Sequence, residues 1–452
     1  MDFRRRRQEE SLHVGNCVYT LHMKTLVLAA GRSRRVKPIE DKNFLKFFGW
    51  TLIEHQLMRL QCAGFSDILL VAGEHNMEKL REIARTQVEQ NPNSKIEVVE
   101  QKNLEEGMAG AILAVEEKIG AEDLFIVSSN DVVDVSAYEL MKAAAQTEGD
   151  SFLLATKVES YFPGGYLKIE DGRIINIVEK PEPGTEPSDM VNVVLHLHKN
   201  PKELFELLKA ASSDQDDRYE VAMDQLMKTR VFKAVPYAEH WQPIKHPWHI
   251  LDLMKHSLKR RERSIHETAQ IAETAVIRGE VVVAEGVKVF DHAVIQGPAY
   301  IGKNSVIANN ALVRESMIGD NCVVGFGTEV ARSFIGDDCW FHSNYVGDTV
   351  MGNNVSFGAG AICANLRLDE KEIKSGGQAS GRNKLGPIFG DDIRVGVNTS
   401  LMPGIRIGSN CMIGSGLTIT QDIGENAYVT GKMELDIRPN EKKVAELTRQ
   451  WT

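Results

Sequence analysis

The stretch VFDHAVIQGPAYIGKNSVIANNALVRESMIG, residues 289–319, carries an aliphatic side chain at almost every sixth position. Val289, Ile295 and Ile301 follow one another at steps of six, and a small residue often comes next, as Gly302 does. With occasional steps of five and one interruption, the series continues at Ile265, Ile271, Ile277, Val283, Ile307, Val313, Ile318, Val324, Val330, Ile335, Phe341, Val346, Met351, Phe357, Phe389, Val395, Leu401, Ile407, Ile413 and Ile419. A six-residue period is the signature of a parallel β-helix, because each side of a coil buries one aliphatic side chain.

The part of the chain before this repeat, residues 24–259, alternates short apolar runs with amphipathic segments. The apolar runs are TLVLAA (25–30), DILLVAG (67–73) and LFIVSS (124–129), and the amphipathic segments include LIEHQLMRLQCAG (52–64) and MAGAILAVEEKIG (108–120). Strands that alternate with helices predict βαβ units and a mostly parallel sheet. Ligands bind at the carboxyl ends of such strands, so the loops over residues 28–35 and 128–134 are the first candidates for a site.

These patterns predict an N-terminal arm over residues 1–22, an α/β domain over 23–250, a linker helix over 251–264, a β-helix over 265–435 and a C-terminal tail over 436–452. The arm is basic but has no apolar run, so it is not predicted to be a signal peptide. It is either a dispensable, disordered arm or the product of an upstream start codon.

Composition excludes several classes of protein. The 452 residues carry a net charge of -10, whereas nucleic-acid binding requires a clustered basic surface. No apolar run approaches the roughly 20 residues that a membrane span needs. The six cysteines are scattered without a CxxC pair, which favours reduced thiols in the cytoplasm over disulfides or a zinc site.

Histidines and one irregular segment need separate interpretation. His196 and His198 alternate along VVLHLHK, which predicts the polar face of an edge strand. His246 and His249 flank Trp248 and are expected to be structural, close to the domain junction. Residues 366–387 interrupt the repeat, and a long loop in a regular solenoid is more often functional than accidental.

The loop LAAGRSRR (28–35) follows a buried strand and contains Gly31 with three arginines, and Lys42 follows shortly after. Backbone N–H groups and basic side chains at such a turn can bind phosphate. A solvated basic turn is the alternative on this motif alone.

The α/β half resembles the sugar-1-phosphate nucleotidyltransferase family, whose first motifs are LAAGxGTRM, PK and GKPLLEH. Here they read LAAGRSRRV, Asp41-Lys42 and GWTLIEH, and the family's sugar-binding EKP motif is intact as Glu179-Lys180-Pro181. The resemblance implies a Rossmann-like domain with Arg35 and Lys42 as catalytic residues, Asp131 as the Mg²⁺ ligand, nucleotide contacts at Leu28, Ala29, Ala30, Gly31, Gln101, Gly107 and Met108, and sugar contacts at Glu179, Lys180 and Asn192.

That resemblance implies in-line attack of a sugar 1-phosphate on the α-phosphate of a nucleoside triphosphate, UTP or dTTP, with release of pyrophosphate. Such chemistry depends on positioning and charge neutralisation. Several positions depart from the family pattern, namely Ser33, Arg34, Asp41, Met108 and Pro243, the last where many relatives carry a second metal-binding aspartate. A degenerate, non-catalytic nucleotide-sugar-binding or regulatory domain therefore remains the alternative.

The repeat half resembles the acyltransferase domain of bifunctional enzymes that acetylate glucosamine 1-phosphate and then uridylylate it, and archaeal-type relatives share this plan. The densest match is HSNYVGDTVMGNNVSFGAGAICANLRL, residues 342–368. The resemblance implies a left-handed β-helix with His342 as catalytic base, Glu329 as its supporting acid, sugar contacts at Arg314, Tyr345, Asn365 and Lys384, and acyl-CoA contacts at Ala359 and Gly360.

An amine that attacks the thioester of acetyl-CoA must lose a proton, and a neutral imidazole suits that step. A zinc site of the β-helical carbonic anhydrase type is disfavoured, because it needs three histidines on neighbouring coils and none follows His342. A purely structural trimer would leave this motif and residues 366–387 unexplained. The sequence therefore predicts a cytoplasmic bifunctional transferase, a homotrimer by resemblance, without nucleic-acid or membrane partners.

Overall fold

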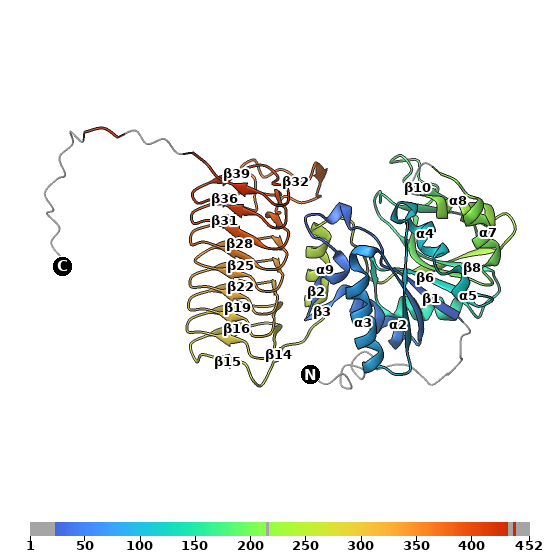
Figure 1. Cartoon of the computed structure of the whole chain (residues 1–452), viewed down its shortest axis with the longest axis horizontal. Coiled ribbons are helices and arrows are strands. Elements are labelled where there is room, and N and C mark those ends of the chain that lie inside the picture. Colours follow the sequence, from blue (N-terminus) through green and yellow to red (C-terminus); the bar gives the residue numbers. More distant parts are fainter. Residues whose placement is uncertain (1–22, 214–216, 433–436, 440–452) are drawn as a thin grey trace.

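The computed structural model describes residues 23–213, 217–432 and 437–439. The expected arm over residues 1–22 and nearly all of the expected tail lie outside these residues. An α/β unit and a tall β-helix lie side by side, with helix α9 (Trp248–Lys259) between them (Figure 1). The predicted Rossmann-like domain followed by a left-handed parallel β-helix is thus confirmed.

The α/β unit is built around one mixed sheet. Its strands are β1 (Met23–Leu28), β4 (Asp67–Ala72), β5 (Lys95–Glu100), β6 (Asp123–Ser128), β8 (Ser151–Lys157), β9 (Gly165–Glu170), β10 (Arg173–Glu179), β11 (Met190–His198) and β12 (Phe232–Tyr237). Its helices are α2 (Leu52–Cys62), α3 (Met77–Gln90), α4 (Gly107–Leu113), α5 (Glu116–Ile119), α6 (Val135–Ala144), α7 (Lys202–Ala210) and α8 (Arg218–Leu226). Because β1 pairs in parallel with both β4 and β6, the carboxyl ends of these three strands meet at one edge.

The β-helix consists of strands two or three residues long, from β14 (Ser264–Ile265) to β40 (Tyr428–Val429), stacked in three parallel sheets. Repeat positions such as Ile301, Ile318 and Val330 are fully buried inside the coils, as predicted. One sheet contains β16 (Val276–Arg278), β19 (Val294–Gln296), β22 (Leu312–Arg314), β25 (Glu329–Ala331), β28 (Tyr345–Gly347), β31 (Ile362–Cys363), β36 (Ser400–Leu401) and β39 (Thr418–Ile419).

The two units share an apolar cluster, called here the interdomain cluster. It joins Val36, Ile39, Leu45, Phe47 and Phe48 of the α/β unit, Trp248, Ile250, Leu251 and Met254 of α9, and Tyr300, Met317, Phe334, Val350, Ile373, Leu385 and Ile388 of the β-helix. The rings of Phe47 and Phe334 lie 5.2 Å apart between centroids. Burial of this apolar surface fixes how the two units sit against each other.

The prediction for His196 and His198 was wrong, because β11 lies inside the sheet between β6 and β8 and both imidazoles are buried. His196 Nδ1 and His198 Nε2 lie 2.9 and 2.8 Å from the Tyr219 hydroxyl. Their other ring nitrogens contact Asn192 Oδ1 at 2.7 Å and Ser151 Oγ at 2.8 Å. A polar pattern in the sequence is here satisfied by hydrogen bonds in the interior rather than by water.

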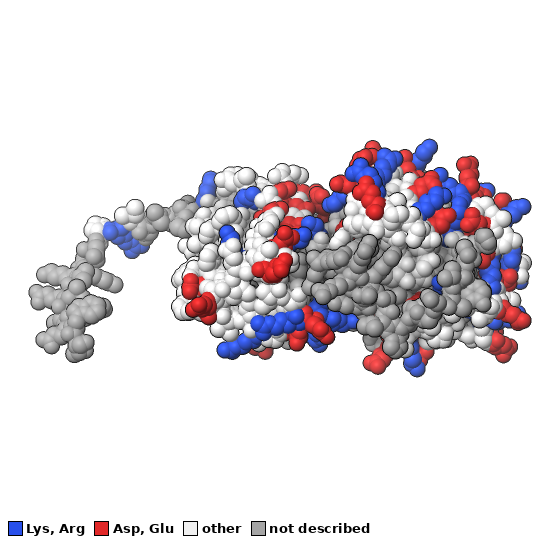
Figure 2. All heavy atoms as spheres, turned by 90° about the horizontal axis from the view of Figure 1, so that it is seen from below, with Lys and Arg blue, Asp and Glu red and all other residues white. Residues whose placement is uncertain are grey.

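None of the helices in the described ranges is long and apolar enough to cross a membrane. On the face shown in Figure 2, acidic and basic side chains intermingle over the α/β half.

The buried histidines predict a pH-dependent stability. Burial, followed by the nearby His198, lowers the pKa of His196 well below its ordinary value, and burial lowers the pKa of His198 to about 3. The unfolded chain binds these protons near pH 6.5, so this stability is present above that pH and is lost as the pH falls from there towards 3. We expect a loss of about 1 kcal/mol per pH unit for each imidazole, measured by denaturant titration of the α/β unit.

The variant His198→Gln removes one of the two titrating rings and should roughly halve that slope. An unchanged slope in this variant would contradict the assignment.

Candidate active sites

The loop after β1 is held in place by amide side chains. Asn43 and Asn76 both donate from Nδ2 to the carbonyl oxygen of Ala29, at 3.1 and 2.9 Å. Asp41 accepts from the backbone N–H of Asn43 at 2.9 Å and from Asn76 Nδ2 at 2.8 Å. Asp41 therefore has a structural use that the family's proline at this position lacks.

The loop residues that depart from the family pattern also form hydrogen bonds. Ser33 is buried, and its Oγ accepts from the backbone N–H of Lys42 at 3.3 Å. Arg32 and Arg34 both donate to Oε1 of Glu105 at 2.8 Å. The replacements for glycine and threonine thus bind other parts of the chain.

Lys42 and Asp131 form the charged centre of this site. Burial, followed by the nearby Arg35, lowers the pKa of Lys42 to about 8, against the opposing effect of the carboxylates of Asp41 and Asp131. Asp131 begins β7 (Asp131–Val133), and burial raises its pKa. The indole N–H of Trp241 donates to Asp131 Oδ1 at 2.8 Å and, like Lys245 and Lys42, partly offsets that increase.

Lys245 is a site residue that the sequence did not identify. Strand β13 (Trp241–Pro243) runs antiparallel to β7 and places Pro243 opposite Asp131, and Lys245 follows two residues later. Its Nζ donates to the carbonyl oxygen of Pro163 at 2.9 Å and lies 4.2 Å from the Phe162 ring centroid.

Burial, with smaller effects of Arg35 and Lys180, lowers the pKa of Lys245 to about 8, and the carboxylates of Asp131 and Glu179 oppose this shift. Lys245 thus lies within electrostatic reach of the predicted catalytic, metal and sugar residues alike. The only signal in the sequence is a lysine placed two residues after the position of the family's second aspartate.

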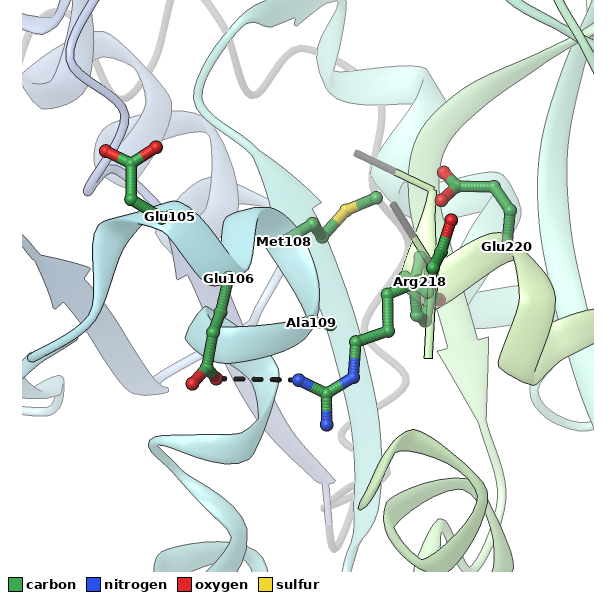
Figure 3. Close-up of a pocket in the computed structure, with 8 residues that line it drawn as sticks. Glu105, Glu106, Met108, Ala109, Arg218 and Glu220 are labelled. Carbon is green, nitrogen blue, oxygen red and sulfur yellow. Dashed lines mark ion pairs between the residues drawn. The ribbon is translucent and has the colours of Figure 1, made fainter. Parts of the chain in front are cut away.

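The predicted nucleotide contacts Gln101 and Gly107 lie together, because Gln101 Nε2 donates to the Gly107 carbonyl oxygen at 2.8 Å. Met108 points from α4 towards α8 and lines a pocket with Glu105, Glu106, Ala109 and Arg218 among others (Figure 3). Glu106 and Arg218 form an ion pair of 3.7 Å across this pocket. A pocket thus lies directly beside the predicted nucleotide contacts Gly107 and Met108.

The predicted sugar contacts also meet. A Cβ atom on Gly165 would lie 3.1 Å from Glu179 Oε2 and 3.7 Å from Asn192 Cβ, so this glycine lies between the two side chains. Glu179 pairs with Lys180 at 3.2 Å. The bond from His196 fixes the side-chain amide of Asn192.

Within the described ranges, no group of three or more His, Cys, Asp or Glu side chains could hold a metal ion. Mg²⁺ typically binds through one or two carboxylates together with substrate phosphates. Asp131 alone fits one such ion, whereas the Pro243 side chain has no ligand for a second.

A second group of polar side chains follows one face of the β-helix. Arg314 on β22 donates from Nε and Nη2 to Glu329 Oε1 at 2.9 and 2.7 Å, and Glu329 on β25 pairs in register with Tyr345 on β28. Asn365 Nδ2 donates to the Tyr345 hydroxyl at 3.2 Å and to Asp348 Oδ2 at 2.5 Å.

Two further charges lie in this group. Arg332, which the sequence did not single out, donates to both carboxylate oxygens of Asp348 at 2.8 and 2.7 Å. Lys384 is exposed, and an isolated bridge to Leu366 brings its backbone next to Asn365.

His342 is exposed at the corner that precedes β28, 6.0 Å from Trp340 between ring centroids. The next coil places Gly360 beneath this corner, where its N–H donates to the Ser343 carbonyl oxygen at 3.2 Å. Gly360 has a φ of 77°, and a Cβ there would lie 2.2 Å from Asn398 Oδ1. Ala359 is exposed beside it.

Glu329 does not meet His342 in any contact among the described residues, and its carboxylate pairs with Arg314 instead. The structure therefore gathers Arg314, Glu329, Tyr345 and Asn365 on one face and leaves His342 on the adjoining corner.

The buried Lys42 and the partly buried Lys245 predict an unusual titration. Lys42 and Lys245 should react with acetic anhydride at a pH where an exposed lysine is still protonated. Asp131→Asn removes a carboxylate that raises both pKa values, so both should fall further. Competitive labelling between about pH 6 and 10, read by mass spectrometry, measures this.

Lys157 serves as the control, because it is exposed and Asp189 raises its pKa. Identical titration of Lys42, Lys245 and Lys157 would contradict the burial argument.

Two family models match separate parts of the chain. The family model described as nucleotidyl transferase matches residues 24–242, and the one described as the GMPPB C-terminal domain matches residues 260–378. The solved apo structure of a UDP-glucose pyrophosphorylase aligns with 53% of this chain and 99% of its own, at 20% identity and a TM-score of 0.48.

Two curated relatives match over almost their whole length. The bifunctional protein GlmU of Methanocaldococcus jannaschii is 29% identical over 92% of this chain and 99% of its own. The bifunctional sugar-1-phosphate nucleotidylyltransferase/acetyltransferase of Sulfurisphaera tokodaii is 30% identical over 90% of this chain and 99% of its own. The chain therefore belongs to the family of bifunctional sugar-1-phosphate nucleotidylyltransferases/acetyltransferases.

Proposed function

We propose that this protein is a bifunctional transferase that acts on hexosamine 1-phosphates. The β-helix transfers the acetyl group of acetyl-CoA to the amine of an amino-sugar 1-phosphate. The α/β unit then joins an N-acetylhexosamine 1-phosphate to a nucleotide from UTP or dTTP. The observation that carries the proposal is the full-length match to two-activity relatives, with charged or polar groups gathered at both predicted sites.

In the nucleotidyl site, positive side chains offset the charge of the triphosphate. The sugar phosphate oxygen attacks the α-phosphorus, a new P–O bond forms, and the bond to the pyrophosphate leaving group breaks. Arg35, Lys42 and Lys245 stabilise negative charge on these oxygens, and the low dielectric around the buried lysines strengthens the attraction. Glu179 and Asn192 orient the sugar hydroxyl groups.

Asp131 would hold Mg²⁺ bound to the triphosphate, and the ion would neutralise phosphate charge. The carboxylate is prepared for this, since Trp241 already fixes Oδ1 and burial favours a charged partner.

The side chains that replace the family's loop residues do not favour a domain that has lost its catalytic activity. Ser33, Arg34 and Asp41 each bind another part of the same loop or its neighbour, so the loop is organised by different bonds. This organisation, together with the names of the relatives, favours an active nucleotidyl site over the non-catalytic alternative.

In the acyl site, His342 acts as the general base. The sugar amine attacks the thioester carbonyl, a C–N bond forms, the C–S bond breaks, and the imidazole accepts the proton that the amine loses. Arg314 and Lys384 bind the sugar phosphate, and Tyr345 and Asn365 contact the sugar. Ala359 and Gly360 bind the acyl donor.

We further propose a homotrimer in the cytoplasm. The exposed side chains of Phe326 and Trp340 lie on two neighbouring coils near the His342 corner, and that of Val397 lies two coils beyond Trp340, so this edge suits a subunit interface. The buried thiols of Cys322, Cys339 and Cys363 suit a reducing compartment.

Each activity should depend on its own residue. Lys42→Ala should lower kcat/KM for pyrophosphate release from UTP or dTTP with N-acetylglucosamine 1-phosphate by about 100-fold. His342→Ala should lower thiol release from acetyl-CoA with glucosamine 1-phosphate by about 100-fold. Each variant is the folding control for the other. Thiol release without pyrophosphate release in the wild-type protein, across all triphosphates and several sugar phosphates, would favour a retired α/β domain.

Metal removal should separate the activities in the same way. EDTA should abolish pyrophosphate release and leave thiol release unchanged, because no step of acyl transfer uses the ion. Asp131→Asn should raise the Mg²⁺ concentration for half-maximal pyrophosphate release by about tenfold. An equal dependence on Mg²⁺ concentration in Asp131→Asn and in the wild-type protein would contradict the proposed role of Asp131 as the Mg²⁺ ligand.

A further inference from the structure

The loop that carries Arg35 and Lys42 lies against the β-helix as well as against its own sheet. Val36 and Ile39, between the two proposed catalytic residues, are buried in the interdomain cluster. The backbone at Pro38 is so close that a Cβ on Gly390 of the β-helix would lie 3.0 Å from its carbonyl oxygen. The position of this loop thus depends on the partner domain.

Arg406 at the start of β37 (Arg406–Ile407) makes a direct polar link to this loop, and Lys37 Nζ adds an exposed ion pair with Glu425 Oε1 at 3.0 Å. Its Nη1 donates to the carbonyl oxygen of Lys37 at 3.0 Å, two residues from Arg35. The other side of the guanidinium binds Ser375, with Nε donating to Oγ at 3.0 Å and Nη2 to the carbonyl oxygen at 3.1 Å.

The Arg406 guanidinium is half-buried, and burial lowers its pKa. Among the described residues its guanidinium forms no ion pair, although the carboxylate of Asp422, which accepts from the backbone N–H of Arg406 at 2.8 Å, opposes the fall in its pKa. A desolvated charge without an ion pair is stable only when its donors are hydrogen-bonded, so its three bonds to oxygen are costly to lose.

The approach of Arg406 requires a glycine next to Ser375. Gly376 has a φ of 57°, and a Cβ there would lie 2.4 Å from Cζ of Arg406. Gly376 follows β32 (Lys374–Ser375), which forms a hairpin with β33 (Gln378–Ala379) inside the excursion over residues 366–387. Side chains at this position would push the guanidinium away from Lys37.

The same excursion reaches the proposed acyl site. At its C-terminal end, the N–H of Leu385 donates to the carbonyl oxygen of Asn365 at 3.0 Å, and Leu385 itself is buried in the interdomain cluster. Arg382 binds Asp252 of α9. The excursion therefore connects the backbone of the acyl site, helix α9 and the guanidinium of Arg406.

We propose that Arg406 of the β-helix is a positioning residue for the nucleotidyl site. Arg406 holds the carbonyl group of Lys37 and thereby the position of Arg35, and the irregular segment over residues 366–387 holds Arg406. The proposal rests on the proposed nucleotidyl function of Arg35 and Lys42. It assigns to an acyltransferase coil a role in the reaction of the other domain.

The test is the full-length variant Arg406→Ala, with Arg394→Ala as the matched control. Arg394 also donates to the carbonyl oxygen of a neighbouring coil, Asn354 at 2.6 Å, but lies within the β-helix. Arg406→Ala should lower kcat for pyrophosphate release about tenfold, with a smaller change in KM, because a misplaced loop weakens the transition state most. Thiol release should stay within about twofold in both variants.

Two further variants test the same proposal if Arg406→Ala is unstable. Arg406→Lys should restore part of kcat, since a lysine can still donate one bond to the Lys37 carbonyl. Gly376→Ala should reproduce the loss of kcat while Arg406 is present. Losses equal to those of Arg394→Ala, or a normal kcat in both Arg406→Ala and Gly376→Ala, would overturn the proposal.

Hydrogen exchange at the amides of Val36 and Ile39 provides a readout that needs no activity. Both N–H groups are bonded within the loop, at 3.0 and 3.1 Å. Exchange should become faster in Arg406→Ala and not in Arg394→Ala. If wild-type protein releases no pyrophosphate, the nucleotidyl function fails, and the exchange rates alone then decide whether Arg406 positions the loop.

Discussion

The burial of one aliphatic side chain at every sixth position is the constraint on which the β-helix half depends. It fixes the height and register of every coil, so residues far apart in the sequence come to lie directly above one another. Arg314, Glu329 and Tyr345 occupy successive strands of one sheet for this reason alone. Because the interior is apolar, polar chemistry is confined to the outer faces and corners. The exposed position of His342 and the departure of the chain after Asn365 are both consequences.

In the α/β half, by contrast, charged side chains lie in the interior. Lys42 and Asp131 are nearly inaccessible to water, and Lys245 is largely withdrawn from it. An isolated buried charge is expensive, but the carboxylate of Asp131 and the two ammonium groups of Lys42 and Lys245 attract each other and offset part of that cost. A triphosphate adds several negative charges to this group, and its binding relieves the excess of positive charge.

The sequence predicted the repeat half well, because periodic burial leaves a direct trace in residue type. Motif residues such as Lys42, Asp131 and Asn365 could be predicted as site residues, since their chemistry ties them to short local patterns, and their roles stay a prediction. Lys245 was missed, because only the pairing of Pro243 with Asp131 brings it to the site. His196 and His198 were misplaced, since alternation cannot distinguish water from the hydroxyl of Tyr219 as a partner. The pairing of Glu329 with Arg314 depends on the stacking of coils and on rotamers, which no motif encodes.

The interdomain cluster has a consequence for how such a protein can change over generations. Phe47 and Phe48 belong to the segment just after the proposed catalytic lysine, yet they pack against Phe334 and Tyr300 of the β-helix. An α/β half that was separated from its β-helix would expose these rings to water beside its own active site. Recombination that exchanged one half for that of a distant relative would break the fit at the same place. A substitution at this junction therefore requires a matching change on the other side to keep the apolar surface covered.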